Sequence, residues 1–167
     1  KAKKNNVKVY KIKINNEWIE VFYNLLEITF LRQNKYVPHT KSFYQNLINI
    51  ENNIICLEAH LEDEFVSAGI FTIDGERITF LSGVSSSIGM KLAASSLIQW
   101  EIIKYGIKNN FKIYDMGGLG VESIDKFKRS FGGIDILHHR WIYRGRLFYF
   151  LEPILIWMSK KGLIKLG

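Results

Sequence analysis

The chain has 167 residues and a formal net charge of +7, with 47% hydrophobic and 23% charged residues. These values are typical of one globular domain with a buried core, and they exclude a disordered, collagen-like or low-complexity chain. A pI of about 9.4 favours partners that carry negative charge, such as nucleic acid, anionic lipid or a phosphorylated ligand.

A single cysteine, Cys56, excludes an internal disulfide framework and a cysteine-rich zinc site. It favours a reducing compartment, so we expect the protein to be cytoplasmic. No apolar segment typical of a signal peptide follows the lysine-rich start, and no apolar run approaches the roughly 20 residues of a spanning helix. Because the first residue is lysine rather than methionine, we expect a piece of a longer or processed protein.

The first part of the chain predicts a strand and a helix. Residues 7–14 alternate apolar and basic side chains, which is the period of a strand with one face in water. Asn15 or Asn16 can cap a helix over about 17–33. Its apolar spacing predicts a buried face at Trp18, Val21, Phe22, Leu25 and Ile28 or Phe30.

A second helix and a meander of three strands follow. Thr40 can cap a helix over about 41–49. Strands are expected over about 53–61, 65–73 and 77–82. Asp74-Gly75 predicts a tight turn between the last two. Gly69 inside the middle strand indicates a bulge or a close backbone approach.

A strand–helix–strand unit comes next. The small residues of 82–89 open into a long helix over about 90–109, and a strand over 111–115 follows it. Because a helical crossover joins them, the strands before and after should be parallel. The helix should bury one face, made by Ala94, Leu97, Ile98, Ile102 and Tyr105.

The C-terminal part predicts a short helix over about 122–131 and a hairpin of strands 134–143 and 146–150 around Arg144-Gly145. Pro153 should then open a last helix over about 154–165. The whole order predicts an α/β fold in which an antiparallel meander leads into a parallel pair, with helices on both faces.

The loop before the long helix is the first candidate site. Its backbone N–H groups and the helix dipole behind them suit a pyrophosphate or a phosphodiester. The residues expected to bind such a cofactor are Ser85, Ser86, Ser87, Gly89 and Lys91. No Walker or GxGxxG pattern accompanies them, so a plain surface loop is the alternative.

The second candidate site combines two glycine pairs, 117–118 and 132–133, with a cationic helix face. Gly117 and Gly118 follow Asp115 at a strand end, where they let a ligand approach the backbone closely. Lys128 and Arg129, with Lys126, could bind phosphate or stabilise an oxyanion. The alternative is a solvated helix face, with Phe127 and Phe131 in the core at i and i+4.

The histidines, the cysteine and the last helix give weaker indications of function than these two candidate sites. His138 and His139 should lie on opposite faces of a strand, and neither they nor other histidines make a metal motif. Cys56 lies in a buried-strand pattern and should be a core filler. The apolar side of the last helix could lie on a membrane surface, or pack on the core or on a partner domain.

Two motifs carry a family resemblance. Tyr114-Asp115-Met116-Gly117-Gly118, followed by Phe127-Lys128-Arg129-Ser130-Phe131-Gly132-Gly133, resembles the FemABX family of peptidoglycan interpeptide-bridge aminoacyltransferases, relatives of the GNAT acyltransferases. Met116 stands where the family has an aromatic residue. The proline that the family often has before the long helix is absent between Ser85 and Leu92.

The resemblance implies a GNAT-like acyltransferase fold over residues 1–167, as the second of two such domains with the first one missing. It implies transfer of an amino acid from aminoacyl-tRNA to an amine of a peptidoglycan precursor, with no tightly bound cofactor. Lys128 would be the catalytic residue, stabilising the tetrahedral oxyanion, and Asp115 is a candidate base. Substrate would contact Phe127, Asp115, Gly117, Gly118 and Arg129.

Two alternatives remain at this point. An acyl-CoA-dependent N-acetyltransferase would use the loop at 82–91 for the CoA pyrophosphate, although its usual loop pattern is not matched. A non-catalytic module that binds RNA or a surface would instead use the basic N-terminal strand.

Overall fold

The computed structural model describes residues 1–32, 34–139, 143 and 145–160. The chain forms two compact units, Lys1–Asp125 and Lys126–Gly167. The single-domain organisation of residues 1–167 stays a prediction.

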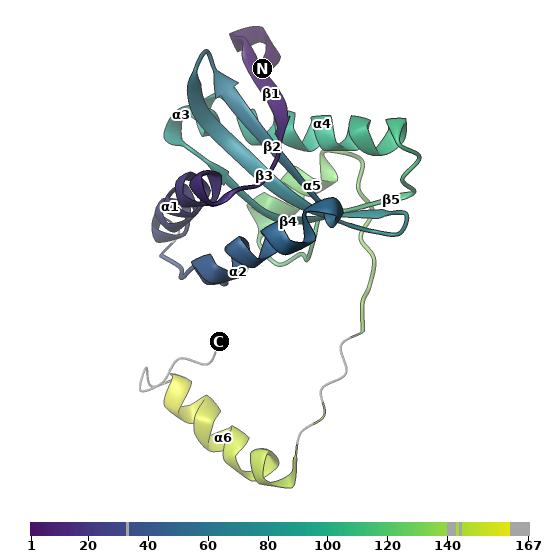
Figure 1. Cartoon of the computed structure of the whole chain (residues 1–167). Helices are drawn as coiled ribbons and strands as arrows, with labels where there is room; N and C mark the ends of the chain where they lie inside the picture. The colour runs from purple at the N-terminus through teal and green to yellow at the C-terminus, as the bar shows by residue number, and fades with distance from the viewer. Residues whose placement is uncertain (33, 140–142, 144, 161–167) are drawn as a thin grey trace. The chain divides into compact units, whose positions relative to one another are not determined.

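The first unit is built on a five-stranded sheet of strand order β1-β2-β3-β4-β5 (Figure 1). The strands are β1 (Val7–Ile12), β2 (Ile54–Leu61), β3 (Glu64–Asp74), β4 (Arg77–Ser85) and β5 (Ile113–Asp115). The first four are antiparallel neighbours, and β5 pairs with β4 in parallel. The predicted α/β class, with a meander passing into a parallel pair, is confirmed.

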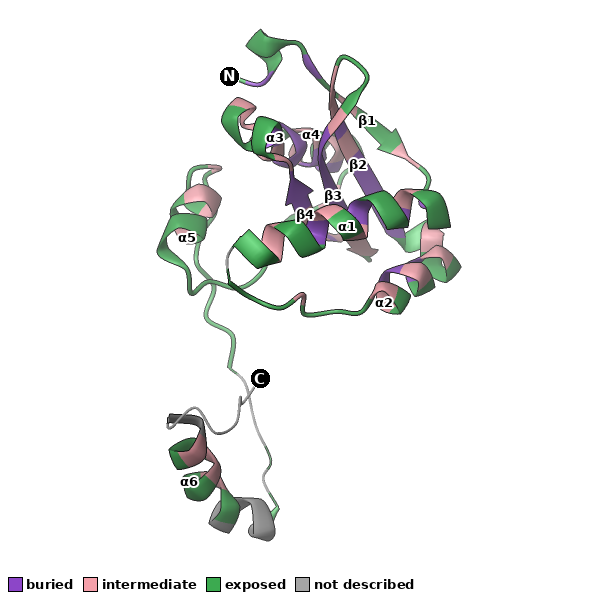
Figure 2. Cartoon of the chain, turned by 90° about the vertical axis from the view of Figure 1, so that its left-hand side faces the viewer, coloured by how far each residue is buried: buried purple, intermediate pink, exposed green. Residues whose placement is uncertain are grey.

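Helices cover both faces of this sheet. They are α1 (Asn16–Arg32), α2 (Lys41–Asn46), α3 (Ser87–Leu92) and α4 (Ala94–Lys108), with 3₁₀ turns at Lys3–Asn5 and Leu47–Asn53. Figure 1 shows α1 and α2 on one face and α4 on the other. Each face has its own apolar cluster, and Figure 2 shows the buried centre of the sheet between the layers.

The predicted N-caps and the predicted buried face of α4 are confirmed, whereas the predicted buried face of α1 is not. Asn15 accepts the N–H of Trp18 at 2.8 Å, and Thr40 accepts that of Phe43 at 3.4 Å. The buried face of α4 lies where the apolar spacing predicts it. In α1, however, the buried residues are Ile19, Phe22 and Leu26. Val21 and Ile28 are exposed, because the apolar residues of this helix are spread too widely to define one face.

Strand β1 differs from the prediction of one wet face. Val7 and Val9 pack into the cluster under α4, whereas Ile12 packs into the cluster under α1 and α2. The apolar residues change from odd to even positions along the strand, so each face is covered over part of its length. Lys11 continues the odd series, and its ammonium lies 4.9 Å from the centre of the Tyr105 ring.

The predicted helix 90–109 is divided. Helix α3 ends at Ala93, which has a φ of 61°, and α4 begins directly after it. Gly89 in α3 approaches the sheet closely, because a Cβ there would lie 2.1 Å from the carbonyl oxygen of Val66. Helix α3 is therefore packed against the start of β3, and α4 follows it after the left-handed turn at Ala93.

Glycines also shape the β3–β4 hairpin. Gly75 has a φ of 54° in the predicted turn. A Cβ on Gly69 would lie 3.0–3.1 Å from the side chains of Phe71 and Ile98, which is the predicted close approach. The register also shifts between Ile70 and Phe71, so a bulge lies next to it.

The second unit corrects the prediction for the C-terminus. Residues 134–139 form no strand, and 146–150 belong to helix α6 (Arg146–Lys160), with Pro153 inside it. Arg144 and residues 140–142 and 161–165 lie outside the described residues. An apolar run of this kind fits either a strand or a helix. Among the described residues of this unit no sheet offers it partners, whereas a helix satisfies its own hydrogen bonds.

Candidate functional site

The strand pairing changes from antiparallel to parallel where β4 meets β5. Their ladder has three residue pairs and ends at Thr79 and Asp115. Strand β4 continues to Ser85, paired with β3 alone, while the chain leaves β5 into the glycine-rich segment 116–120. One side of β4 beyond Thr79 is therefore without a neighbouring strand in the described part of the chain.

Asp115 organises the turn that follows β5. Its Oδ1 accepts the N–H of Gly117 at 2.8 Å, and its Oδ2 lies 3.4 Å from Nη1 of Arg77. Gly117 has a φ of 79°, which favours glycine. Gly118 is exposed, and a Cβ on it would meet nothing within 4 Å. The turn thus leaves space beside Gly118 at the end of the sheet.

A partly buried polar pair supports this strand from the α4 side. The Tyr114 hydroxyl donates to Oε1 of Gln99, whose side chain is buried. Burial, with the charge of Asp115, raises the pKa of Tyr114. The phenol therefore stays neutral at pH 7 and holds β5 against α4.

The predicted phosphate loop is packed rather than open. Ser85 and Gly89 are buried, whereas Ser87 and Lys91 are exposed. The Ser86 hydroxyl accepts the N–H of Gly89 at 3.0 Å, and the Ser86 N–H donates to Val66 O at 2.9 Å. Met90 N–H donates to Ser86 O. Three N–H groups of this loop are thus used within the protein, and its role as a cofactor site stays a prediction.

Sequence reasoning missed two side chains from α1 and α2. Arg32 donates to the Ser85 carbonyl at 2.9 Å, at the end of β4. Tyr44 is buried, and its hydroxyl lies 3.2 Å from Oγ of Ser82 on the same strand. Burial raises the pKa of this phenol. No local pattern signals such contacts, because they join positions 38 and 53 residues apart.

In the second unit, the Phe-Lys-x-x-Phe-Gly-Gly element ends α5 (Glu122–Arg129). The Phe127 and Phe131 rings meet edge to face at 5.1 Å between centroids. Gly132 has a φ of 81° and donates its N–H to Arg129 O, which ends the helix. Lys128 is partly buried, and its carbonyl accepts the N–H of Phe131.

Arg129 has a carboxylate partner within its own unit. Its Nη2 lies 2.6 Å and its Nε 3.3 Å from the two carboxylate oxygens of Asp135. The guanidinium holds the pKa of Asp135 below its usual range. The predicted substrate contacts of Arg129, Phe127 and Lys128, and their meeting with Asp115 and Gly117, stay predictions.

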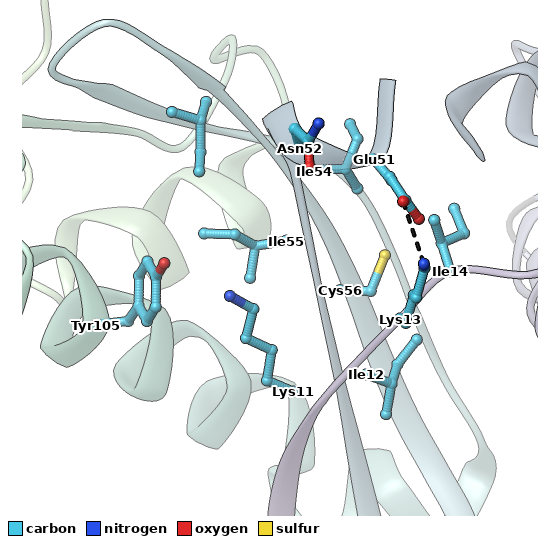
Figure 3. Close-up of a pocket in the computed structure, with 11 residues that line it drawn as sticks. Lys11, Ile12, Lys13, Ile14, Glu51, Asn52, Ile54, Ile55, Cys56 and Tyr105 are labelled. Carbon is cyan, nitrogen blue, oxygen red and sulfur yellow. Dashed lines mark ion pairs between the residues drawn. The ribbon is translucent and has the colours of Figure 1, made fainter. Parts of the chain in front are cut away.

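A cavity of about 370 Å³ lies at the opposite edge of the sheet, where the chain leaves β1 (Figure 3). Figure 3 shows Lys11 and Tyr105 on one side and the Lys13–Glu51 ion pair, 3.1 Å long, on the other. Cys56 lines it but is buried, and burial raises the pKa of its thiol to about 12. The thiol is therefore neutral at pH 7, and the interpretation as a core residue is confirmed.

The comparison with protein families matches the FemAB family over residues 49–137. This span is more than half of the chain and contains both glycine motifs. No curated protein sequence matches the chain significantly.

Solved structures share the fold. FemX matches with a TM-score of 0.67 and 14% identity, over 78% of this chain and 51% of that one. An aminoglycoside acetyltransferase from an uncultured soil metagenomic sample, in complex with sisomicin, matches with a TM-score of 0.64 and 15% identity, over 84% of this chain and 99% of that one. The aminoglycoside acetyltransferase AAC(6')-Iy matches with a TM-score of 0.60 and 8% identity, over 84% and 98%.

The chain thus spans about half the length of FemX and nearly the full length of shorter acetyltransferases. The family match and the five-stranded fold agree with the sequence motifs. This chain therefore belongs to the FemAB family and is an acyltransferase with a GNAT-like fold.

Proposed function

We propose that this chain transfers an aminoacyl group from aminoacyl-tRNA to an amine of a peptidoglycan precursor. The observation that carries the proposal is the pair of glycine motifs inside the region that matches the FemAB family. The space beside Gly118 and the partly buried Lys128 are its structural support.

The chemistry needs few reactive groups. A neutral amine attacks the ester carbonyl, a tetrahedral oxyanion forms, and the ribose hydroxyl of the tRNA leaves with the proton that the amine loses. The Lys128 ammonium would stabilise the oxyanion, and the Phe127 ring would stack on a terminal base. Asp115 holds the Gly117 turn and contacts Arg77, so we assign it a positioning role rather than that of the base. Because the ester is already activated, positioning supplies much of the rate.

An acyl-CoA-dependent N-acetyltransferase is the second candidate. The observation in its favour is the match with nearly the full length of single-chain aminoglycoside acetyltransferases. The loop at residues 85–91 argues against it, because Ser86 and Gly89 use their N–H groups within the protein.

A two-donor assay separates these candidates. The purified chain is given tRNA charged with a labelled amino acid and a nucleotide-linked peptidoglycan precursor, and acetyl-CoA is titrated in a parallel calorimetric experiment. We expect label in the precursor and no heat from acetyl-CoA. Tight acetyl-CoA binding, with acetyl transfer and no aminoacyl transfer, would exclude our proposal in favour of the second candidate.

Replacing Gly118 with alanine tests the open turn. The fold should keep its melting temperature, because the new methyl group meets nothing within 4 Å. Aminoacyl transfer should fall about 10- to 100-fold, because a ligand held against this backbone is displaced. Gly145→Ala is the matched control, since its Cβ also meets nothing. Equal activity of the two variants would show that no ligand approaches Gly118.

A further inference from the structure

The cavity where the chain leaves β1 has the size and lining of a ligand site. Its volume of about 370 Å³ lies in the range of pockets that hold small organic molecules. The described residues contain no helix long and apolar enough to cross a membrane, and no cluster of histidine, cysteine, aspartate or glutamate that could hold a metal ion. The apolar lining of the cavity includes Ile54, Ile55 and Cys56 of β2, which are all buried. Every lining residue belongs to the first unit, so the shape of the cavity is set within that unit.

The charged side chains that line the cavity leave one positive charge unbalanced. Lys13 is neutralised by Glu51, which lies 3.1 Å away. Lys11 is exposed, and in the described part of the chain no carboxylate lies within ion-pair distance of it. Its ammonium lies 4.9 Å from the centre of the Tyr105 ring instead. A ring face engages only part of an ammonium with three N–H donors, so Lys11 can still bind an anion.

Tyr105 adds a second donor beside Lys11. Its ring stacks on Phe111, with 6.3 Å between the centroids, which holds the ring in place. Its hydroxyl has no hydrogen-bond partner among the residues that the structure describes. Figure 3 shows this hydroxyl and the Lys11 ammonium pointing toward the part of the cavity beside Ile55. Two donors next to an apolar wall complement a ligand that has an anionic group and a short apolar body.

We propose that this cavity binds a small organic monoanion, a carboxylate with a short apolar chain. The carboxylate accepts from the Lys11 ammonium and the Tyr105 hydroxyl, and the chain contacts Ile55 and Ile73. One unbalanced ammonium matches one negative charge, which favours a carboxylate over a phosphate dianion. The proposal does not rest on the proposed function, because no lining residue belongs to a glycine motif and binding needs neither tRNA nor a peptidoglycan precursor.

Titration followed by two-dimensional amide NMR tests the proposal on the full chain. The probes are isovalerate, its neutral analogue isovaleramide and inorganic phosphate, compared at constant ionic strength. We expect isovalerate to shift the amide signals of Lys11, Lys13 and Ile55 with a Kd of about 1–10 mM, which is usual for a ligand of this size. Isovaleramide and phosphate should bind about tenfold more weakly or less. Equal binding of isovaleramide or of phosphate would contradict a site for an apolar carboxylate.

Lys11→Gln should weaken isovalerate binding about tenfold, because a charge-assisted hydrogen bond is lost. Lys8→Gln is the matched control. Lys8 is exposed on the same strand and does not line the cavity, so its replacement removes the same charge at a different place. Its Kd should stay within about twofold of that of the unmodified chain, because salt screens a distant charge. If both variants lose affinity equally, the net charge of the protein attracts the anion and the proposal is wrong.

Tyr105→Phe gives a second test inside the cavity. It keeps the ring that contacts Lys11 and Phe111 and removes only the hydroxyl. We expect about threefold weaker binding or more, with an unchanged melting temperature. Binding that neither Lys11→Gln nor Tyr105→Phe alters, or no binding of isovalerate by the unmodified chain, would refute the proposal. Isovalerate binding by a chain that transfers no aminoacyl group would refute the proposed function alone.

Discussion

Replacing Lys128 with alanine is expected to lower the rate of aminoacyl transfer about 10²- to 10³-fold. The proposed oxyanion carries a full negative charge, and removing one fixed donor from such a site typically costs this much in rate. The change should appear in kcat more than in KM, because the charge develops in the transition state. Single-turnover transfer from charged tRNA measures it directly.

Lys126→Ala is the matched control for this variant. Lys126 lies on the same helix, two residues earlier, and is exposed. Its replacement removes the same charge from the helix without removing the proposed donor. If the two variants transfer the aminoacyl group at equal rates, Lys128 has no catalytic role. Unchanged melting temperatures would show that a difference in rate does not come from a loss of stability.

Gly89→Ala should destabilise the first unit by about 3 kcal/mol, the upper part of the usual range for overpacking. The new Cβ would lie 2.1 Å from Val66 O and 2.7 Å from Oγ of Ser85. Backbone atoms cannot yield as a flexible side chain does. The same carbonyl also accepts the N–H of Ser86, so the start of β3 and the start of α3 must move together. Urea unfolding measures the loss.

Gly118→Ala provides the reference for that measurement, since it adds the same methyl group in open space. Its free energy of unfolding should stay within about 0.5 kcal/mol of the unmodified chain. Wild-type stability of Gly89→Ala would mean that the α3 junction is loosely packed.

The meander was predictable because its signals are local. The turn at Asp74-Gly75 and the caps Asn15 and Thr40 act within a few residues, and the structure uses all of them. The break at Ala93 was not predictable, because nothing between Leu92 and Ser95 interrupts a helical pattern. The contact of Gly89 with Val66 was not predictable either, because it joins α3 to another element.

The prediction for the C-terminal region was wrong for a different reason. Periodicity cannot separate a strand from a helix in a short aromatic run such as 147–150. A strand also needs a neighbour, and its presence is a property of the whole fold. A proline such as Pro153 is typical of a helix start, whereas α6 already runs through it.

The candidate site was predicted from motifs and not from geometry. Asp115, Gly117 and Lys128 stand in recognisable patterns, so a single sequence suffices to predict them as site residues, and their roles stay predictions. Arg32 and Tyr44 reach β4 from helices that precede it by many residues. Such contacts depend on how α1 and α2 pack on the sheet, which no local pattern encodes.

The apolar residues of β1 change from odd to even positions along the strand. This change fixes the register in which β1, the outermost strand, pairs with β2. A slip by one residue would turn Val7 away from the α4 layer and Ile12 away from the α1 layer at the same moment. Lysines would enter two apolar clusters instead of one. An outer strand anchored in two layers at once has a single acceptable alignment with its neighbour.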